Sequence, residues 1–244
     1  NLIPVEYVKY YNPRIKYDVI NWCISVGIEY EASNILPSNE GIGIDLGIKD
    51  LAVGSDKKND ENINRTQKVK KLEKRKRRLQ RCIARRYEKN KKGESYCKTH
   101  NIIKGEKELL KLNHKLTNIR QNHLHQTTSS IIKREPSFIC LEDLNVKGMM
   151  KNRHLSKAVQ QQGFYEFRRH IEYKSRWNNI QVIIADRFFP SSKLCICCGR
   201  MKKDLKLSDR IYRCECGNRI DRDYQAALNL KGYGEMYLKQ QSAG

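Results

Sequence analysis

Three short acidic segments, each placed beside an apolar run, constrain the fold of this chain more than any other feature. Asp45 follows Gly-Ile-Gly-Ile, Glu142 follows Phe-Ile-Cys-Leu, and Asp221 and Asp223 precede Tyr-Gln-Ala-Ala. They are far apart in the sequence, so only a tertiary fold can bring their carboxylates together. Converging carboxylate oxygens bind Mg²⁺-type ions, and a pair of such ions can cleave a phosphodiester.

The charge balance indicates which phosphodiester that is. The chain has 244 residues, with 49 Lys and Arg against 27 Asp and Glu, a formal net charge of +22. Such an excess favours a polyanionic partner, and we expect nucleic acid binding that weakens with salt. We predict no membrane association, because the sequence has no long apolar span, signal-peptide pattern or lipidation motif. The length allows one or two domains, and the first residue, Asn1, suggests a fragment or a processed product.

The cysteines predict a closed metal site. Five of the nine cysteines fall in Cys195-Ile-Cys-Cys198-Gly and Cys214-Glu-Cys216-Gly. Two such pairs can supply four thiolates to a tetrahedral, structural Zn²⁺ ion. We choose Cys195, Cys198, Cys214 and Cys216 as ligands, with Cys197 as the alternate. Clustering of this kind favours a reducing compartment, the cytoplasm, over a secreted disulfide framework.

The pattern around Asp45 predicts a strand that begins at Gly41 and continues to Leu51. Asp45 shares its face with glycines, which we expect to leave open space where a ligand can approach. The alternating residues are Ile42, Ile44 and Leu46 on one face, and Gly43, Asp45 and Gly47 on the other.

The rest of the chain alternates strand-like and helix-like segments, which indicates an α/β fold. The predicted strands cover part of Tyr17–Ala32, Ser137–Leu141 and Ile180–Ala185. The predicted helices are a basic one over Arg65–Lys92, a second around Leu109–Ile119, an amphipathic one over Gly163–Trp177, and a closing one from Asp223. We expect a polar loop over Asn90–Gly105, so that the first two helices form an antiparallel hairpin.

Each acid also has an ordinary interpretation. Asp45 fits a turn or strand end, and Glu142 fits a solvated strand end. Asp221 and Asp223 fit a helix N-terminus, where Asp favours capping and the helix dipole. The order of these acids relative to the cysteine pairs favours the site.

That order resembles the TnpB family of transposon-encoded, RNA-guided nucleases, relatives of the compact type V CRISPR effectors. The similarity covers roughly residues 39 to 244. The matching segments are Gly43-Ile-Asp-Leu-Gly-Ile-Lys49, Leu141-Glu-Asp-Leu-Asn-Val-Lys147, Pro190-Ser-Ser-Lys-Leu-Cys195 and Asp221-Arg-Asp-Tyr-Gln-Ala-Ala-Leu-Asn229.

The resemblance implies an RNase H-like (RuvC-type) α/β core with a mixed sheet, an inserted basic helical hairpin and a zinc ribbon. Residues 39–190 would form the nuclease core, with the hairpin at about 63–134. Residues 191–217 would form the zinc ribbon and 218–244 the last RuvC segment. Family members carry an N-terminal module that reads the flanking DNA motif and grips the guide RNA, and residues 1–38 are expected to be its last strands.

The resemblance also implies the site and its partners. Asp45, Glu142 and Asp223 match the metal-binding triad, which would hold two Mg²⁺ or Mn²⁺ ions. Asp223 is preferred to Asp221 because the family's acid lies two residues before an Asn, here replaced by Gln225. That replacement and the short second cysteine pair are departures from the family. The partners would be a guide RNA and its target DNA, with recognition largely through base pairing.

The basic hairpin is expected to contact phosphates of a guide–target duplex or of the displaced strand. A solvated, functionally neutral face is the alternative. The proposed contacts are Lys68, Lys70, Lys71, Lys74, Arg75, Arg77, Arg78, Arg81, Arg85 and Arg86.

Two other functions fit part of the sequence. Gly-Ile-Asp-Leu-Gly also opens the sugar-kinase and heat-shock ATPase fold, but there small hydroxylated residues follow, whereas here Ile48 and Lys49 follow. A guide-RNA- and DNA-binding fragment or repressor without cleavage activity is the second alternative. The presence of all three acids favours an RNA-guided DNA endonuclease of a transposable element.

Overall fold

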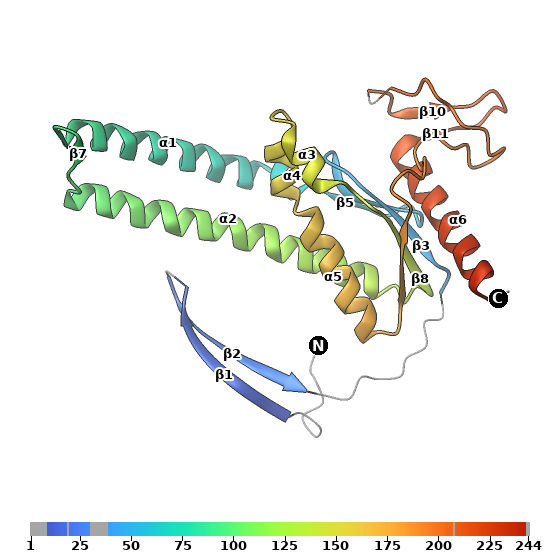
Figure 1. Ribbon diagram of the computed structural model, residues 1–244, viewed down its shortest axis with the longest axis horizontal. Helices are drawn as coiled ribbons and strands as arrows, with labels where there is room; N and C mark the ends of the chain where they lie inside the picture. Colours follow the sequence, from blue (N-terminus) through green and yellow to red (C-terminus); the bar gives the residue numbers. More distant parts are fainter. Residues whose placement is uncertain (1–8, 19, 30–38, 207, 243–244) are drawn as a thin grey trace. The chain divides into compact units, whose positions relative to one another are not determined.

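The computed structural model describes residues 9–18, 20–29, 39–206 and 208–242, and divides into two compact units (Figure 1). One unit comprises residues 1–33 and 65–121, and the other comprises residues 34–64 and 122–244. Parts of the expected N-terminal segment, residues 1–8 and 30–38, lie outside the described residues. None of the helices in the described ranges is both long enough and apolar enough to cross a membrane.

The second unit is built on a five-stranded mixed sheet in the order β5-β4-β3-β8-β9. β3 pairs in parallel with β8, β8 pairs in parallel with β9, and β4 and β5 are antiparallel additions at one side. The strands are β3 (Ile42–Leu46), β4 (Asp50–Gly54), β5 (Asn59–Glu61), β8 (Phe138–Glu142) and β9 (Gln181–Ala185). The single strand expected over Gly41–Leu51 is wrong, because the chain turns between Leu46 and Asp50.

Helices cover both faces of this sheet (Figure 1). On one face, Ile42, Ile44 and Leu46 of β3 pack in a core with Phe167 and Ile171 of α5 (Phe164–Trp177). The C-terminal part of α2 (His100–Ile132) joins the same core. Three further elements are short: η2 (Ile63–Arg65) follows β5, and α3 (Val146–Lys151) and α4 (Ser156–Gln162) lie between β8 and α5.

The opposite face is covered by α6 (Arg222–Ser242). Phe138 and Cys140 of β8 pack there with Leu230 of α6. Because side chains alternate along a strand, Glu142 belongs to this α6 face, as do Gly43 and Asp45 of β3. The sheet therefore places both carboxylates on the side of α6.

The first unit contains an antiparallel helical hairpin of α1 (Gln67–Lys89) and the first part of α2 (His100–Ile132). Arg120 pairs with Glu73 at 2.7 Å, and Tyr87 donates a hydrogen bond to Glu106 at 2.7 Å. The connection contains β6 (Lys91–Lys92) and β7 (Ser95–Tyr96). The polar loop expected over Asn90–Gly105 is therefore too long, because α2 already begins at His100.

The same unit contains a β-hairpin of β1 (Lys9–Tyr17) and β2 (Trp22–Glu29), paired antiparallel. Both strands are almost entirely exposed. The rings of Tyr17 and Trp22 meet at a centroid distance of 5.1 Å beside the turn.

Candidate active site

Asp45 and Glu142 lie side by side at the C-terminal ends of β3 and β8. The parallel register pairs Gly43 with Cys140 and Ile44 with Leu141, so the next position pairs Asp45 with Glu142. Neighbouring strands lie about 4.8 Å apart, and residues in register point to the same face. The segments around positions 45 and 142 are thus joined directly by the sheet.

Asp223 reaches this position because α6 lies directly on β3. A Cβ added to Gly43 would come within 2.1 Å of the Ala227 carbonyl oxygen and 2.3 Å of the Lys231 nitrogen. Asp223 precedes Ala227 by about one helical turn, and Asp45 follows Gly43 by two strand residues, so both steps span roughly 6 Å. The open space expected beside Asp45 at Gly43 is therefore wrong. This glycine is needed for the close approach of a helix.

Close contact at Gly43 predicts the outcome of a small substitution. In Gly43→Ala the new methyl group would collide with the α6 backbone, and overpacking of this kind costs about 1–3 kcal/mol. We expect a lower midpoint in urea unfolding and weaker activity, because Asp223 moves with α6. Gly232→Ala on the same helix is the matched control, since nothing lies within 4 Å of its added Cβ. Equal stability of the two variants would contradict the inferred packing.

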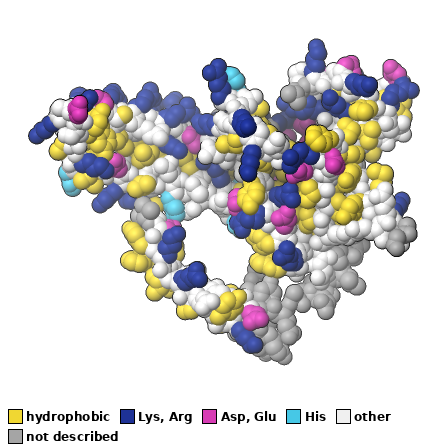
Figure 2. Space-filling model, in the orientation of Figure 1, with side chains coloured by type: hydrophobic (Ala, Val, Ile, Leu, Met, Phe, Trp, Pro, Cys, Tyr) yellow, Lys and Arg dark blue, Asp and Glu magenta, His cyan; other side chains and the backbone are white. Residues whose placement is uncertain are grey.

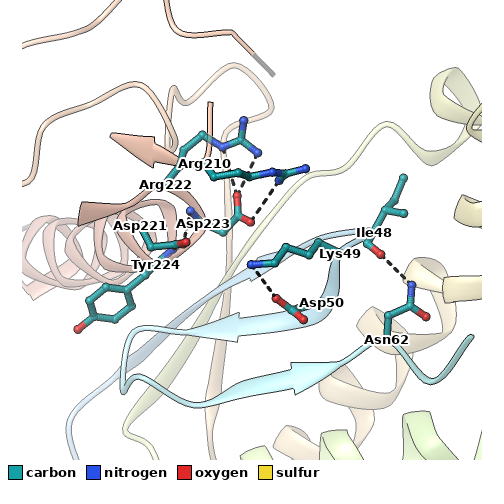
Figure 3. A network of polar contacts seen from close by, with 9 residues as sticks. All are labelled: Ile48, Lys49, Asp50, Asn62, Arg210, Asp221, Arg222, Asp223 and Tyr224. Carbon is teal, nitrogen blue, oxygen red and sulfur yellow. Dashed lines mark hydrogen bonds and ion pairs between the residues drawn. The ribbon is translucent and has the colours of Figure 1, made fainter. Parts of the chain in front are cut away.

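Asp221 and Asp223 have different roles at the start of α6 (Figure 3). The Asp221 carboxylate accepts hydrogen bonds from the backbone nitrogens of Asp223 and Tyr224, both at 3.0 Å, so it caps the helix. The Asp223 carboxylate accepts bonds from Arg222 at 3.1 and 3.2 Å, and Arg210 lies 3.7 Å away. Arg210 lies beside the cysteine-rich segment, so that segment also contributes charge to the site.

The carboxylates influence one another electrostatically. Burial raises the pKa of Asp45 well above its usual range, and the charges of Glu142 and Asp223 raise it further, against a lowering by Arg222. Burial also raises the pKa of Glu142. The carboxylate oxygens of the three acids do not all lie within 4.8 Å of one another. Among the described residues, a cluster of cysteines does meet this spacing. Repulsion between ionised carboxylates and the pull of Arg222 on Asp223 favour the wider spacing of the carboxylate oxygens.

The turn after Asp45 is braced by buried amides. Gln162 donates a hydrogen bond to the Gly47 carbonyl at 2.8 Å. Asn62 donates one to the Ile48 carbonyl at 2.7 Å, which Figure 3 shows. These bonds satisfy the carbonyls of the β3–β4 turn and fix the end of β3. Lys49 in this turn pairs with Asp50 at 3.6 Å.

The cysteine cluster has the geometry of a metal site. The sulfurs of Cys195, Cys198, Cys214 and Cys216 all lie within 4.8 Å of one another. Two of the Sγ–Sγ distances are 3.6 Å. Tetrahedral coordination at a Zn–S distance of about 2.3 Å requires a sulfur separation of about 3.8 Å. The cluster could therefore hold a metal ion such as zinc. Cys197, the alternate ligand, is not in it and is exposed.

The cysteine cluster is linked to α6 by chain continuity and by hydrogen bonds. The second cysteine pair lies between β10 (Ile211–Arg213) and β11 (Arg219–Asp221), and β11 runs directly into α6. Asn218 donates hydrogen bonds to the Cys195 sulfur at 3.4 Å and to Gln225 at 2.9 Å. Asn229 donates to the Ser191 and Leu194 carbonyls at 2.6 and 2.7 Å. The cluster thus fixes the helix end that carries Asp223.

All ten basic residues proposed as nucleic acid contacts on α1 are exposed, and Figure 2 shows Lys and Arg side chains along the helical hairpin. Two of them also contact α2 across the hairpin. Arg86 donates to the Asn101 carbonyl at 2.8 Å, and Arg75 lies 3.8 Å from Glu108.

Several residues at the site carry no strong sequence signal. Arg222 lies between Asp221 and Asp223, and this adjacency is the sequence signal that could have identified it as part of the site. Arg210 and the bracing amides Asn62 and Gln162 come from segments with no motif. Only the three-dimensional arrangement identifies them.

The fold and the site together define a mixed α/β protein with converging carboxylates and a four-cysteine cluster. The model of the "Probable transposase" family OrfB_IS605 matches residues 24–153, more than half of the chain. The model of the "Cas12f1-like, TNB domain" matches residues 164–230. The chain therefore belongs to the OrfB family of IS605-type transposons, which confirms the resemblance to TnpB proteins.

Curated relatives have related names. The chain is 30% identical over 213 residues to a "Putative RNA-guided DNA endonuclease" of Streptomyces pristinaespiralis, covering 87% of this chain and 50% of the relative. It is 30% identical over 245 residues to "Putative RNA-guided DNA endonuclease InsQ" of Escherichia coli K12, covering 93% of this chain and 57% of the relative. The chain thus spans about half the length of these relatives.

Two solved structures share the fold. A CRISPR-Cas12f ternary complex, determined by cryo-EM, matches with a TM-score of 0.59 and 21% identity, covering 93% of this chain and 46% of the matched chain. A Cas12f1–sgRNA–target DNA complex matches with a TM-score of 0.53 and 18% identity, covering 89% and 55% of the two chains. These similarities show a mixed α/β fold like that of the Cas12f1 effectors.

Proposed function

We propose that this chain is the nuclease part of an RNA-guided DNA endonuclease of a transposable element. The observation that carries the proposal is the convergence of Asp45, Glu142 and Asp223 on one face of the sheet. Names of the curated relatives support the reaction class, and the net charge of +22 supports a nucleic acid substrate.

We assign residues 39–190 and 218–244 to a RuvC-like, RNase H-type core. The parallel β3-β8-β9 arrangement, with β4 and β5 added antiparallel, supports this assignment. Residues 191–217 would be a zinc ribbon, because four thiolates at tetrahedral spacing suit Zn²⁺, and a reduced cluster suits the cytoplasm. Residues 1–38 would belong to the guide- and DNA-binding module of the longer relatives.

The donor set fits Mg²⁺ or Mn²⁺. Three carboxylates supply hard oxygen ligands, and bound cations would offset the burial and the neighbouring negative charges that raise the pKa of Asp45. Two such ions would activate water for in-line attack and stabilise the leaving 3′ oxygen. The carboxylates themselves would position the ions, while Arg222 and Arg210 limit the negative charge at Asp223. The exposed basic residues of α1 would hold guide RNA or DNA phosphates.

The test is cleavage of a labelled DNA strand by the purified chain, with and without guide RNA, in Mg²⁺, Mn²⁺ or EDTA. We expect divalent-dependent cleavage that Glu142→Gln abolishes, because the amide removes an anionic ligand with little change in shape. Cleavage retained in Glu142→Gln would overturn the assigned site. Tight DNA binding without cleavage in any divalent ion would favour the binding or repressor function instead.

A further inference from the structure

A cavity lies next to the proposed catalytic carboxylates, at the same end of the sheet but on the face covered by α5. Its volume is about 450 Å³, and its lining includes Leu46, Leu141 and Glu142. The two leucines follow or precede the acids on β3 and β8 and point to the opposite face. The cavity therefore shares Glu142 with the proposed catalytic site, but it has an apolar floor.

Two arginines at this cavity are held by one carboxylate. Asp143 accepts a hydrogen bond from Arg168 Nη1 at 3.2 Å and another from Arg187 Nε at 2.9 Å. Glu172 accepts a further bond from Arg168 at 2.8 Å. The Asp143 carboxylate is hydrogen-bonded to both guanidinium groups, so it fixes their orientation. The two positive charges also offset its repulsion of an incoming anion.

Donors remain on both guanidinium groups. Within the described part of the chain, Nη2 of Arg168 and Nη1 of Arg187 have no hydrogen-bond partner. Lys147 adds a third cation to the lining, against the two acids Glu142 and Asp143. The cavity can thus offer oriented donors to a phosphate group.

Aromatic side chains complete the lining. Phe164 is buried at the cavity, and Tyr165, which also lines it, is 68% exposed. An exposed aromatic ring beside oriented arginines matches the two parts of a nucleotide, since a base stacks on the ring and a phosphate accepts from the guanidinium groups.

We infer that this cavity binds a single nucleotide of the DNA strand being cut, next to the phosphate at the carboxylates. The base packs on Tyr165 over the apolar floor, and its phosphate accepts from Arg168 and Arg187. Asp143 is a positioning residue for the two arginines. This inference rests on the proposed nuclease function for its orientation relative to the cut.

The test locates the bound nucleotide directly. The full chain, in buffer without Mg²⁺ or Mn²⁺, is irradiated with a hexathymidylate that carries one 4-thiothymidine, and the crosslinked peptide is identified by mass spectrometry. We expect crosslinking in the tryptic peptide 158–168, which contains Tyr165. Tyr165→Ala should reduce the yield about tenfold, because base–aromatic stacking is lost. Location is the main readout, since basic residues elsewhere also bind phosphates.

Matched variants separate the cavity from general charge. Arg187→Ala should reduce this crosslink and weaken cleavage, whereas Arg169→Ala, which removes the same charge from an arginine outside the lining, should not. Arg187→Lys keeps the charge and covers the case in which Arg187→Ala loses stability.

The outcomes are distinct. No crosslink in peptide 158–168 from a chain that cleaves DNA would overturn the cavity assignment, as would stronger crosslinking by the corresponding uridine oligonucleotide. A crosslink there that depends on Tyr165, in a chain that never cleaves, would support the nucleotide site and overturn the nuclease proposal.

Discussion

Cys198→Ser is expected to release the bound metal, unfold the segment around residues 191–221 and abolish cleavage. Structural zinc contributes folding free energy of about 10 kcal/mol or more in small domains, and loss of one thiolate breaks a closed site. Apart from the buried Tyr212, the segment is held by short elements, since β10 and β11 are each three residues long. Unfolding of this segment should also displace the start of α6, which carries a carboxylate of the site, because Asn218 and Asn229 form hydrogen bonds between the segment and α6.

Cys197→Ser is the control for this variant, because Cys197 is exposed and lies outside the four-sulfur cluster. Metal content measured by atomic absorption should fall from one zinc per chain to none in Cys198→Ser only. Limited proteolysis should then cut within residues 191–221. A fully folded Cys198→Ser variant that retains both zinc and cleavage would contradict the metal assignment.

Asp45→Asn is expected to reduce cleavage but to raise the stability of the fold in the absence of Mg²⁺ or Mn²⁺. Loss of a ligand to the ions is expected to reduce cleavage roughly a thousandfold, about 4 kcal/mol of transition-state stabilisation. The same change removes a buried negative charge that Glu142 and Asp223 disfavour, so metal-free Asp45→Asn should be more stable than the original chain near pH 7.

The sign of the pH dependence follows from the raised pKa of Asp45. In the folded state the Asp45 carboxyl group keeps its proton at pH values where the same group in the unfolded state has lost it. The free energy of unfolding therefore falls as the pH rises from the usual aspartate pKa, and the loss is complete above the raised pKa in the folded state. Without Mg²⁺ or Mn²⁺, the original chain should lose stability over this interval, and Asp45→Asn should lose less.

Thermal unfolding from pH 4 to 8 in buffer without Mg²⁺, Mn²⁺ or chelator, which leaves the cysteine site loaded, and again with Mg²⁺ or Mn²⁺, tests both parts. A divalent ion at 100 times its dissociation constant should stabilise the original chain by about 2.7 kcal/mol and Asp45→Asn much less. Glu61→Gln is the control, because it removes an exposed acid from β5. Equal stabilisation of all three proteins by metal would contradict the proposed ligand set.

Much of the fold was predictable because alternation and short apolar runs are local signals. The buried strand at Ser137–Leu141 and the helix at Gly163–Trp177 lie within a residue of β8 and α5. The cysteine spacing gave the four cluster members. In each case the pattern itself carries the information, as apolar periodicity or as paired ligands.

Other features depend on packing between distant segments. The turn between β3 and β4 contains no proline or strong turn pair, so the alternation alone predicts one strand over Gly41–Leu51. Gly43 gave no sign of whether a ligand or a helix would occupy the space beside it. Gln225, a departure from the family pattern, lies buried against Asn218, a contact that no local pattern encodes.

Hydrogen is the sole substituent that fits at Gly43, so α6 cannot slide along β3 without breaking the contact. The backbone segments that carry Asp45 and Asp223 are consequently held against each other by the packing of α6 on β3. For the proposed nuclease, this packing leaves the entry of DNA into the centre, rather than a movement of α6 along β3, as the step at which cutting would be controlled.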